Sequence, residues 1–360
     1  MFSVLPQLGL DYQPCEAFKL QTGYSGEYTW FDRASSEDHR IHRFPLNATG
    51  KVGDTSWSIG NSFTYIDGSN EGPVFGRPGD IPAIGGIPLR DRRSALIYRG
   101  SLKVRQPLGG PWFLEPVANA YVHDFYTVQR ANPIGPNRVY ENYVDRQEVT
   151  GGVMVGRDIG RHTELSLGYV YGRQDQFSLL GTDSPYDSHI HRILMGLRGQ
   201  PASWVRLDWL VGPDFRDFDR PIAGFDDDEV LAFVQCSATL MPTKADRIVL
   251  FNKRYLQPAY GGPSVYEDVT YRITWQRQWC PEFSSQVGFQ AYEGDWQLPA
   301  RRDDWIFTPS VTLTYQWRKK LTVQLAYSYD WTDCEYAGVT YSDGRNFTRH
   351  IGSLLVGWRF

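Results

Sequence analysis

The stretch Leu321-Thr-Val-Gln-Leu-Ala-Tyr-Ser-Tyr-Asp-Trp331 decides the fold. Its apolar and aromatic side chains occur at every second position: Leu321, Val323, Leu325, Tyr327, Tyr329 and Trp331. Small and polar side chains occupy the positions between them. Successive side chains of a β-strand point to opposite faces, whereas a helix repeats every 3.6 residues and would scatter both sets around its axis. The stretch is therefore predicted to be a strand with one apolar face that ends in aromatic residues.

The same alternation recurs along the chain, over residues 18–30, 96–104, 164–171, 269–279 and 305–317. No apolar run approaches the roughly 20 residues that a membrane helix needs, and the mean hydropathy is −0.44. A transmembrane strand is apolar only at every second residue, so this average is compatible with a membrane barrel. The 22 Tyr, 19 Phe and 12 Trp are enough to supply the aromatic girdles that such barrels carry at both lipid–water interfaces.

The connections between the predicted strands alternate in length. Short connections are predicted at 52–55, 107–111, 159–161, 200–203, 242–246, 280–282 and 318–320. Longer ones lie between them, and the longest runs from Asp67 to Arg93 and is rich in Gly and Pro. Short periplasmic turns that alternate with longer extracellular loops are typical of transmembrane barrels.

The alternation predicts 17 strands, near residues 2–12, 17–31, 39–50, 55–66, 94–106, 112–128, 143–157, 163–177, 188–199, 203–217, 228–241, 246–257, 266–279, 283–296, 305–317, 321–332 and 347–360. Bacterial single-chain barrels usually have an even number of strands. Either residues 1–16 are a lead-in to a barrel of 16 strands, or they form a first strand and a further strand precedes it, which gives 18. Strand direction bears on this choice. The first and last segments are predicted to run the same way, but neighbours at a closing seam should be antiparallel. The first segment is therefore either not the closing strand or is preceded by another one.

The expected fold class is therefore all-β, a transmembrane antiparallel β-barrel of 16–18 strands with short periplasmic turns and longer extracellular loops. No Ser/Gly run, charge block or low-complexity stretch divides the chain. Residues 1–360 are accordingly predicted to form a single outer-membrane domain, with residues 67–93 as its long loop. The expected location is the cell outer membrane of a Gram-negative bacterium. Residues 1–4 have neither the basic nor the apolar region of a signal peptide, so a leader is expected to lie outside this numbering.

The last segment, Gly352-Ser-Leu-Leu-Val-Gly-Trp-Arg-Phe360, alternates in the same way. Its apolar side chains share one face: Leu354, Val356, Trp358 and Phe360. An amphipathic last strand with a terminal Phe resembles the assembly signal of outer-membrane proteins, so these four residues are predicted to form that signal. The sequence also predicts that this strand closes the barrel.

Deletion of Phe360 should impair insertion into the membrane, because the assembly machinery would lose the terminal aromatic residue of this signal. The amount of protein at the cell surface measures the effect. Normal surface levels of the truncated protein would refute this role.

Both ends of the chain resemble the putative β-barrel porin 2 group of Gram-negative bacteria. The segments that carry the resemblance are 4–10, 23–28 and 341–350, the last of which reads Tyr-Ser-Asp-Gly-Arg-Asn-Phe-Thr-Arg-His. The resemblance implies an outer-membrane barrel and a further strand before the first one seen here. It brings no catalytic residues.

If the apolar positions face lipid, the positions between them face the lumen. The predicted pore-lining residues are basic: Arg99, Lys103, Arg105, Arg192, Arg198, Arg206, Arg216 and Arg272. The predicted inward-facing acids are fewer: Asp11, Glu27, Glu164, Asp208, Asp214 and Asp330. These charges could form a paired network that stiffens the wall, or they could favour anions or acidic polymers. The 67–93 loop, which carries four arginines, is a candidate constriction.

Enzymatic and metal-binding functions find little support. The four cysteines are scattered, and no G-x-S-x-G, H-E-x-x-H or phosphate-binding loop is present. The run Asp226-Asp-Asp-Glu229 is predicted to be a solvated loop, and His189 and His191 share a strand face without a third ligand. The sequence predicts neither enzymatic activity nor a cofactor nor a metal site.

The sequence leaves two functions open. The first is a channel, either a passive porin or the outer-membrane exit of a polysaccharide export system. The second is a plugged structural barrel that anchors or receives a partner protein complex. The expected partners are outer-membrane lipid, the assembly machinery during biogenesis, and an export or membrane complex; nucleic acid is not expected.

Overall fold

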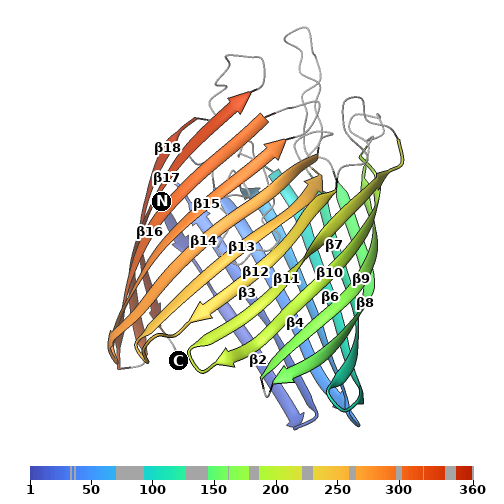
Figure 1. Ribbon diagram of the computed structural model, residues 1–360. Coiled ribbons are helices and arrows are strands. Elements are labelled where there is room, and N and C mark those ends of the chain that lie inside the picture. Colours follow the sequence, from blue (N-terminus) through green and yellow to red (C-terminus); the bar gives the residue numbers. More distant parts are fainter. Residues whose placement is uncertain are drawn as a thin grey trace.

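The computed structural model describes the chain except for residues 33–34, 36–37, 70–92, 127–144, 161, 178–185, 221–229, 259–264, 297–301, 319, 337–345 and 359–360. The described residues form 18 strands: β1 (Phe2–Val4), β2 (Gln7–Cys15), β3 (Phe18–Trp30), β4 (His39–Val52), β5 (Thr55–Ser69), β6 (Arg93–Gly109), β7 (Trp112–Phe125), β8 (Arg146–Gly160), β9 (Thr163–Gln176), β10 (Ser188–Ala202), β11 (Val205–Phe218), β12 (Leu231–Leu240), β13 (Asp246–Pro258), β14 (Val265–Cys280), β15 (Phe283–Trp296), β16 (Arg302–Trp317), β17 (Leu321–Tyr336) and β18 (Thr348–Trp358). Figure 1 shows them as long, tilted ribbons around a barrel.

The first two strands form one interrupted line along β3. Phe2 pairs with Trp30 at one end, and Gln7 pairs with Ser25 after the break. Pro6 lies at the break and has no backbone N–H to donate to the ladder. Its carbonyl oxygen still accepts a hydrogen bond from the Gly26 N–H, at 2.9 Å. Residues 2–15 are thus paired strands, and all 17 predicted segments are present, the first one split in two.

From β2 to β18 each strand pairs antiparallel with the next one along the chain. The predicted short connections are confirmed and lie at the lower end of Figure 1. Between β6 and β7, Gly109 and Gly110 have φ of 102° and 57°, a region that a residue with a Cβ rarely adopts. Glycine at these two positions therefore lets the chain reverse within a few residues.

The two faces of each strand have opposite character. Large apolar side chains are exposed on one face, as are Leu167, Ile193 and Leu325. Many polar and charged side chains are buried on the other face, as are Gln174 and Arg192. This inversion of the usual arrangement is the one expected where the outer wall contacts lipid rather than water. Among the described residues no helix is long and apolar enough to cross a membrane.

The first and last strands run in the same direction, as the sequence predicted. β18 ends beside the start of β17, where Trp358 pairs with Leu321, and β2 likewise ends at a short turn. Within the described ranges no residue-by-residue register joins β18 to β1 or β2. Phe360 lies outside the described residues, so its predicted roles in closure and assembly stay predictions. Most of the 67–93 loop and the acidic run 226–229 also lie outside them.

An ion pair on the outer wall joins the loop-side ends of β9 and β11. The Arg173 guanidinium donates to both carboxylate oxygens of Asp219, at 2.6 Å each. These hydrogen bonds hold the pKa of Asp219 below its usual value. The carboxylate is 37% exposed, so solvent screens the pair.

Asp219→Asn should lower the free energy of unfolding by about 0.5 kcal/mol at pH 7, the range of an exposed pair. Because the pKa of Asp219 is lower in the folded than in the unfolded state, the ionised carboxylate stabilises the fold at pH values above its unfolded pKa of about 3.9. This stabilisation is lost as the pH falls through the pKa of the folded state. The difference between wild type and variant should therefore shrink as the pH falls below about 3.9. Unfolding titrations at pH 7 and pH 3 measure it, and a difference that is larger at pH 3 would contradict the sign.

Candidate functional site

The candidate site is the inner wall near the short turns, where a charged network spans β6 to β11. Its members, here called the turn-side network, are Lys103, Arg105, Glu115, Asp158, Glu164, Arg198 and Asp208. Three of these residues are predicted pore-lining cations, and Glu164 and Asp208 were predicted to face inward with them. Strand alternation places all seven side chains on the face opposite the exposed apolar side chains.

Glu115 and Glu164 are the two hubs of this network. Oε1 of Glu115 lies 3.2 Å from Lys103 Nζ and 3.3 Å from Arg198 Nη2. Arg198 Nη1 lies 3.3 Å from Glu164, which also accepts a hydrogen bond from Arg105. Arg105 Nη2 donates to Asp158 at 2.8 Å. Glu115 is on β7 and Arg198 is on β10, so their contact passes over two intervening strands.

Sequence reasoning missed Glu115 and Asp158. Glu115 lies in Phe113-Leu-Glu-Pro-Val117, where Phe113 is itself buried on the inner face, against the usual polarity of this wall. The Arg105 guanidinium carbon lies 3.5 Å from the centre of the Phe113 ring, which accounts for that aromatic residue on the inner side. The alternation that assigns aromatic residues to lipid therefore fails on β7, where Phe113, Tyr121 and Phe125 are all buried on the inner face.

A second group lies further from the short turns, and four of its five members are buried. It is called here the buried charged cluster and consists of Glu148, Gln174, Arg192, Asp214 and Arg216. Asp214 is 0% exposed, and its Oδ2 accepts from Arg192 Nε at 2.9 Å and from Arg216 Nη2 at 3.3 Å. Arg216 also donates to Gln174 Oε1 and to the Leu256 carbonyl oxygen, at 3.1 Å each. One carboxylate thus holds two buried guanidinium groups.

The remaining predicted pore-lining cations behave differently. Arg99 lies over the Tyr121 ring at 5.4 Å, and Arg272 lies over the Phe251 ring at 4.9 Å. Arg206 is exposed, and no ion pair involves it within the part of the chain that the structure describes. Within the described ranges, ion pairs hold at least five of the eight predicted cations, which favours a paired network at this wall over an array of free positive charges.

A cavity of about 400 Å³ adjoins the turn-side network. Charged side chains line it: Glu16, Lys19, Lys51, Lys103, Arg105, Glu115 and Arg198. Basic residues outnumber acidic ones in this lining, so the cavity retains a positive bias although several of its charges are paired. A polar cavity of this kind can admit hydrated solutes and small anions.

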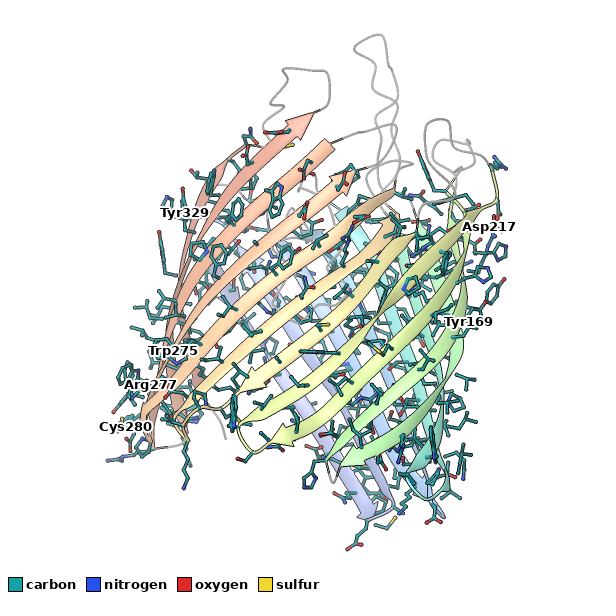
Figure 2. The ribbon with its side chains drawn as sticks, viewed as in Figure 1. Tyr169, Asp217, Trp275, Arg277, Cys280 and Tyr329 are labelled. Atoms are coloured by element: carbon teal, nitrogen blue, oxygen red, sulfur yellow. The ribbon has the colours of Figure 1, made fainter. Side chains whose placement is uncertain are left out.

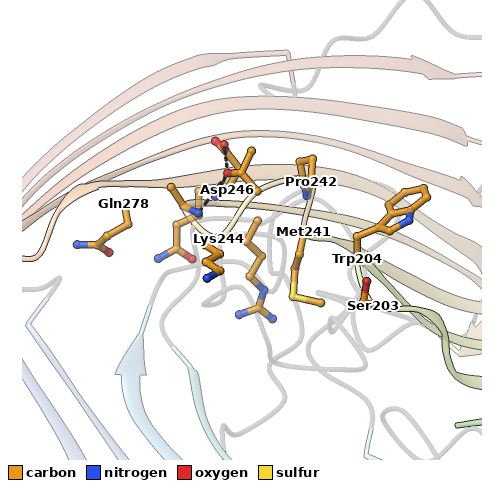
Figure 3. Close-up of a pocket in the computed structure, with 11 residues that line it drawn as sticks. Ser203, Trp204, Met241, Pro242, Lys244, Asp246 and Gln278 are labelled. Atoms are coloured by element: carbon orange, nitrogen blue, oxygen red, sulfur yellow. Dashed lines mark hydrogen bonds between the residues drawn. The ribbon is translucent and has the colours of Figure 1, made fainter.

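A larger cavity, of about 1070 Å³, lies at the turns that follow β10 and β12 (Figure 3). Asp246 organises its edge by accepting hydrogen bonds from Thr243 Oγ1 at 2.6 Å and from Trp275 Nε1 at 3.0 Å. Lys244, Met241 and Trp204 also line it. Within the described ranges no group of three His, Cys, Asp or Glu side chains could hold a metal ion.

No family model matches the sequence, and no curated protein matches it. Solved structures do resemble the fold. The FrpB iron transporter from Neisseria meningitidis aligns with a TM-score of 0.51 and 10% identity over 99% of this chain and 64% of that one. The ferric-catecholate import receptor Fiu from E. coli K12 aligns with a TM-score of 0.48 and 9% identity, over 99% of this chain and 73% of that one. The siderophore receptor PiuA from Acinetobacter baumannii aligns with a TM-score of 0.45 and 11% identity, over 92% of this chain and 63% of that one.

The likeness to FrpB concerns the fold alone, and this chain spans 64% of that protein's length. Together with the described strands it defines the class of this protein, which is an all-β, transmembrane antiparallel β-barrel of the outer-membrane type.

Proposed function

We propose that the protein is an outer-membrane channel that lets small polar solutes cross passively, with the turn-side network at its periplasmic mouth. The observation that carries this proposal is the coexistence of an exposed apolar outer wall with a charged, ion-paired inner wall around a 400 Å³ cavity. Barrels of 16–18 strands can enclose an aqueous channel. The resemblance of both chain ends to the porin 2 group supports the same function.

The charges of the turn-side network also suggest how the channel would select. Arg198 contacts three carboxylates and Arg105 contacts two, so their fields are largely neutralised by close neighbours. The surplus of basic side chains in the cavity lining leaves a mild preference for anions. Such a channel would pass neutral and anionic solutes of small size rather than select one ligand tightly.

Conductance in planar lipid bilayers tests the proposal. The purified barrel should give stepwise conductance with a modest preference for chloride over potassium. A barrel that stays closed at every applied voltage would overturn the channel function. If the channel instead exports a polysaccharide, that polymer should block the conductance from the periplasmic side, and polymer-synthesis genes should lie beside its gene.

The buried charged cluster favours a second candidate, a plugged barrel that anchors a partner complex. Three charged side chains of the inner wall are nearly or fully buried: Asp214, Lys253 and Asp268. Side chains that line an open aqueous channel would be exposed to water. Lys253 Nζ and Asp268 Oδ1 form an ion pair at 2.9 Å there. A plugged barrel should be silent in bilayers and should copurify with a second protein from native membranes; isolation as a lone chain would contradict it.

A further inference from the structure

Three tyrosine–histidine pairs repeat one geometry on the outer wall. Tyr24 pairs with His42 at 2.9 Å, Tyr169 with His191 at 2.6 Å and Tyr327 with His350 at 2.8 Å, in each case between the tyrosine hydroxyl and the histidine Nδ1. The pairs lie on β3/β4, β9/β10 and β17/β18; the sheet order places the first and third near each other across β2, and the second far from both. Figure 2 labels Tyr169 and Tyr329, a neighbour of the third pair, at opposite sides of the outer wall.

The three pairs also share one offset from the short-turn end of their strands. Each tyrosine is six residues after the first residue of its strand, Phe18, Thr163 or Leu321. Two residues after each tyrosine, the same strand carries the register partner of the histidine. These partners are Gly26, Tyr171 and Tyr329. With a rise of about 3.3 Å per residue and a tilt of about 40°, the histidines lie about 20 Å from the short-turn end.

Exposed tryptophans mark the opposite edge of the lipid-facing band. They lie at or beside strand ends near the short turns: Trp112, Trp279, Trp317 and Trp358. The apolar band of outer-membrane barrels is about 25 Å tall and has an aromatic girdle at each edge. The tryptophans fit the periplasmic girdle, and the tyrosine–histidine pairs therefore fit the interface on the loop side.

The second ring nitrogen of these three histidines is available for another contact. Among the described residues, no hydrogen bond involves Nε2 of His42, His191 or His350. The tyrosine hydroxyl can donate to Nδ1 or accept from it. The pair can therefore persist in both charge states of the imidazole, while Nε2–H stays a donor.

Among the described residues, the groups that contact the three rings carry no negative charge. His42 contacts the rings of Tyr24, Tyr28 and Tyr65. His191 contacts the rings of Tyr169 and Tyr171, with Phe215 opposite on β11. His350 contacts the rings of Tyr327 and Tyr329. An exposed cation, Arg40, lies two residues from His42 on the same strand face.

The fourth histidine on this face, His189, is a natural contrast. Its Nδ1 contacts the Tyr171 hydroxyl at 2.6 Å, but its Nε2 is 2.9 Å from Arg173 Nη1 and 3.9 Å from Asp219 Oδ1. Asp217 is its register partner on β11. Both nitrogens of His189 thus have protein partners.

We propose that Nε2 of His42, His191 and His350 donates hydrogen bonds to lipid phosphate groups at the loop-side interface, so that the three pairs set the depth of the barrel in the membrane. Phosphate is the anionic acceptor at this height, and an imidazole donor with its other nitrogen fixed by a tyrosine is oriented for it.

Solid-state NMR tests this contact directly. Protein labelled with ¹⁵N-histidine in phosphatidylglycerol bilayers at pH 6 should show dephasing of the Nε2 signals by lipid ³¹P. The variant His42→Phe/His191→Phe/His350→Phe should lose most of this dephasing, whereas the control His189→Phe should keep it.

Several outcomes would overturn the proposal. Absence of dephasing in the wild type at pH 6, or equal dephasing in the triple variant, would show that these histidines do not contact lipid phosphate. Frozen maltoside micelles with inorganic phosphate form the comparison arm, and equal dephasing there would indicate a site for free phosphate instead. If the triple variant fails to insert, each single variant should lose about one third of the signal, and unchanged single variants would refute the contact.

Discussion

Glu115→Gln is expected to raise the preference of the channel for chloride over potassium about fivefold. The substitution removes one negative charge from the turn-side network and leaves Lys103 and Arg198 without their shared partner. Both cations are more than a third exposed, so they become hydrated and contribute their field to the cavity. A unit charge acting over about 4 Å in water contributes about 1 kcal/mol, which corresponds to about a fivefold change in permeability ratio.

The reversal potential across a bilayer in a KCl gradient measures this change. Asp217→Asn is the matched control, because it removes the same charge from the outer wall, where Figure 2 labels Asp217. The control should leave the reversal potential unchanged. Equal shifts in the two variants would show that net charge, rather than the network, determines selectivity.

Asp214→Ala is expected to lower the free energy of unfolding by about 3 to 5 kcal/mol, because it leaves Arg192 and Arg216 buried without their carboxylate. Asp208→Ala, six residues earlier on the same strand face, is the matched control. The Asp208 side chain is 71% exposed and lies 3.8 Å from Arg198, so its loss should cost less than about 0.5 kcal/mol.

Urea titrations of the two variants in lipid vesicles measure the difference. Equal destabilisation would mean that the buried charged cluster is solvated in the native barrel. That result would also weaken the plugged-barrel alternative, which relies on the burial of Asp214 and its neighbours.

The alternation of residues 321–331 predicted a strand and its two faces, and β17 has both. The same pattern assigned Arg192, Arg198, Glu164 and Asp214 to one side of the wall. Such predictions succeed because the side-chain period of a strand is local, and lipid outside a barrel demands apolar residues at alternate positions. The prediction failed at Phe113, where a contact with Arg105 on the neighbouring strand outweighs the pattern.

By itself the sequence predicted the fold class, the strands and part of the set of inward-facing charges. Only the tertiary structure decided which of those charges meet. Arg198 and Glu115 are 83 residues apart and come together because strand register and barrel stagger bring β10 and β7 to one height. The three tyrosine–histidine pairs arise in the same way, from equal offsets on hairpins far apart in the chain. Register between strands is a property of the whole sheet, so no single segment encodes these contacts.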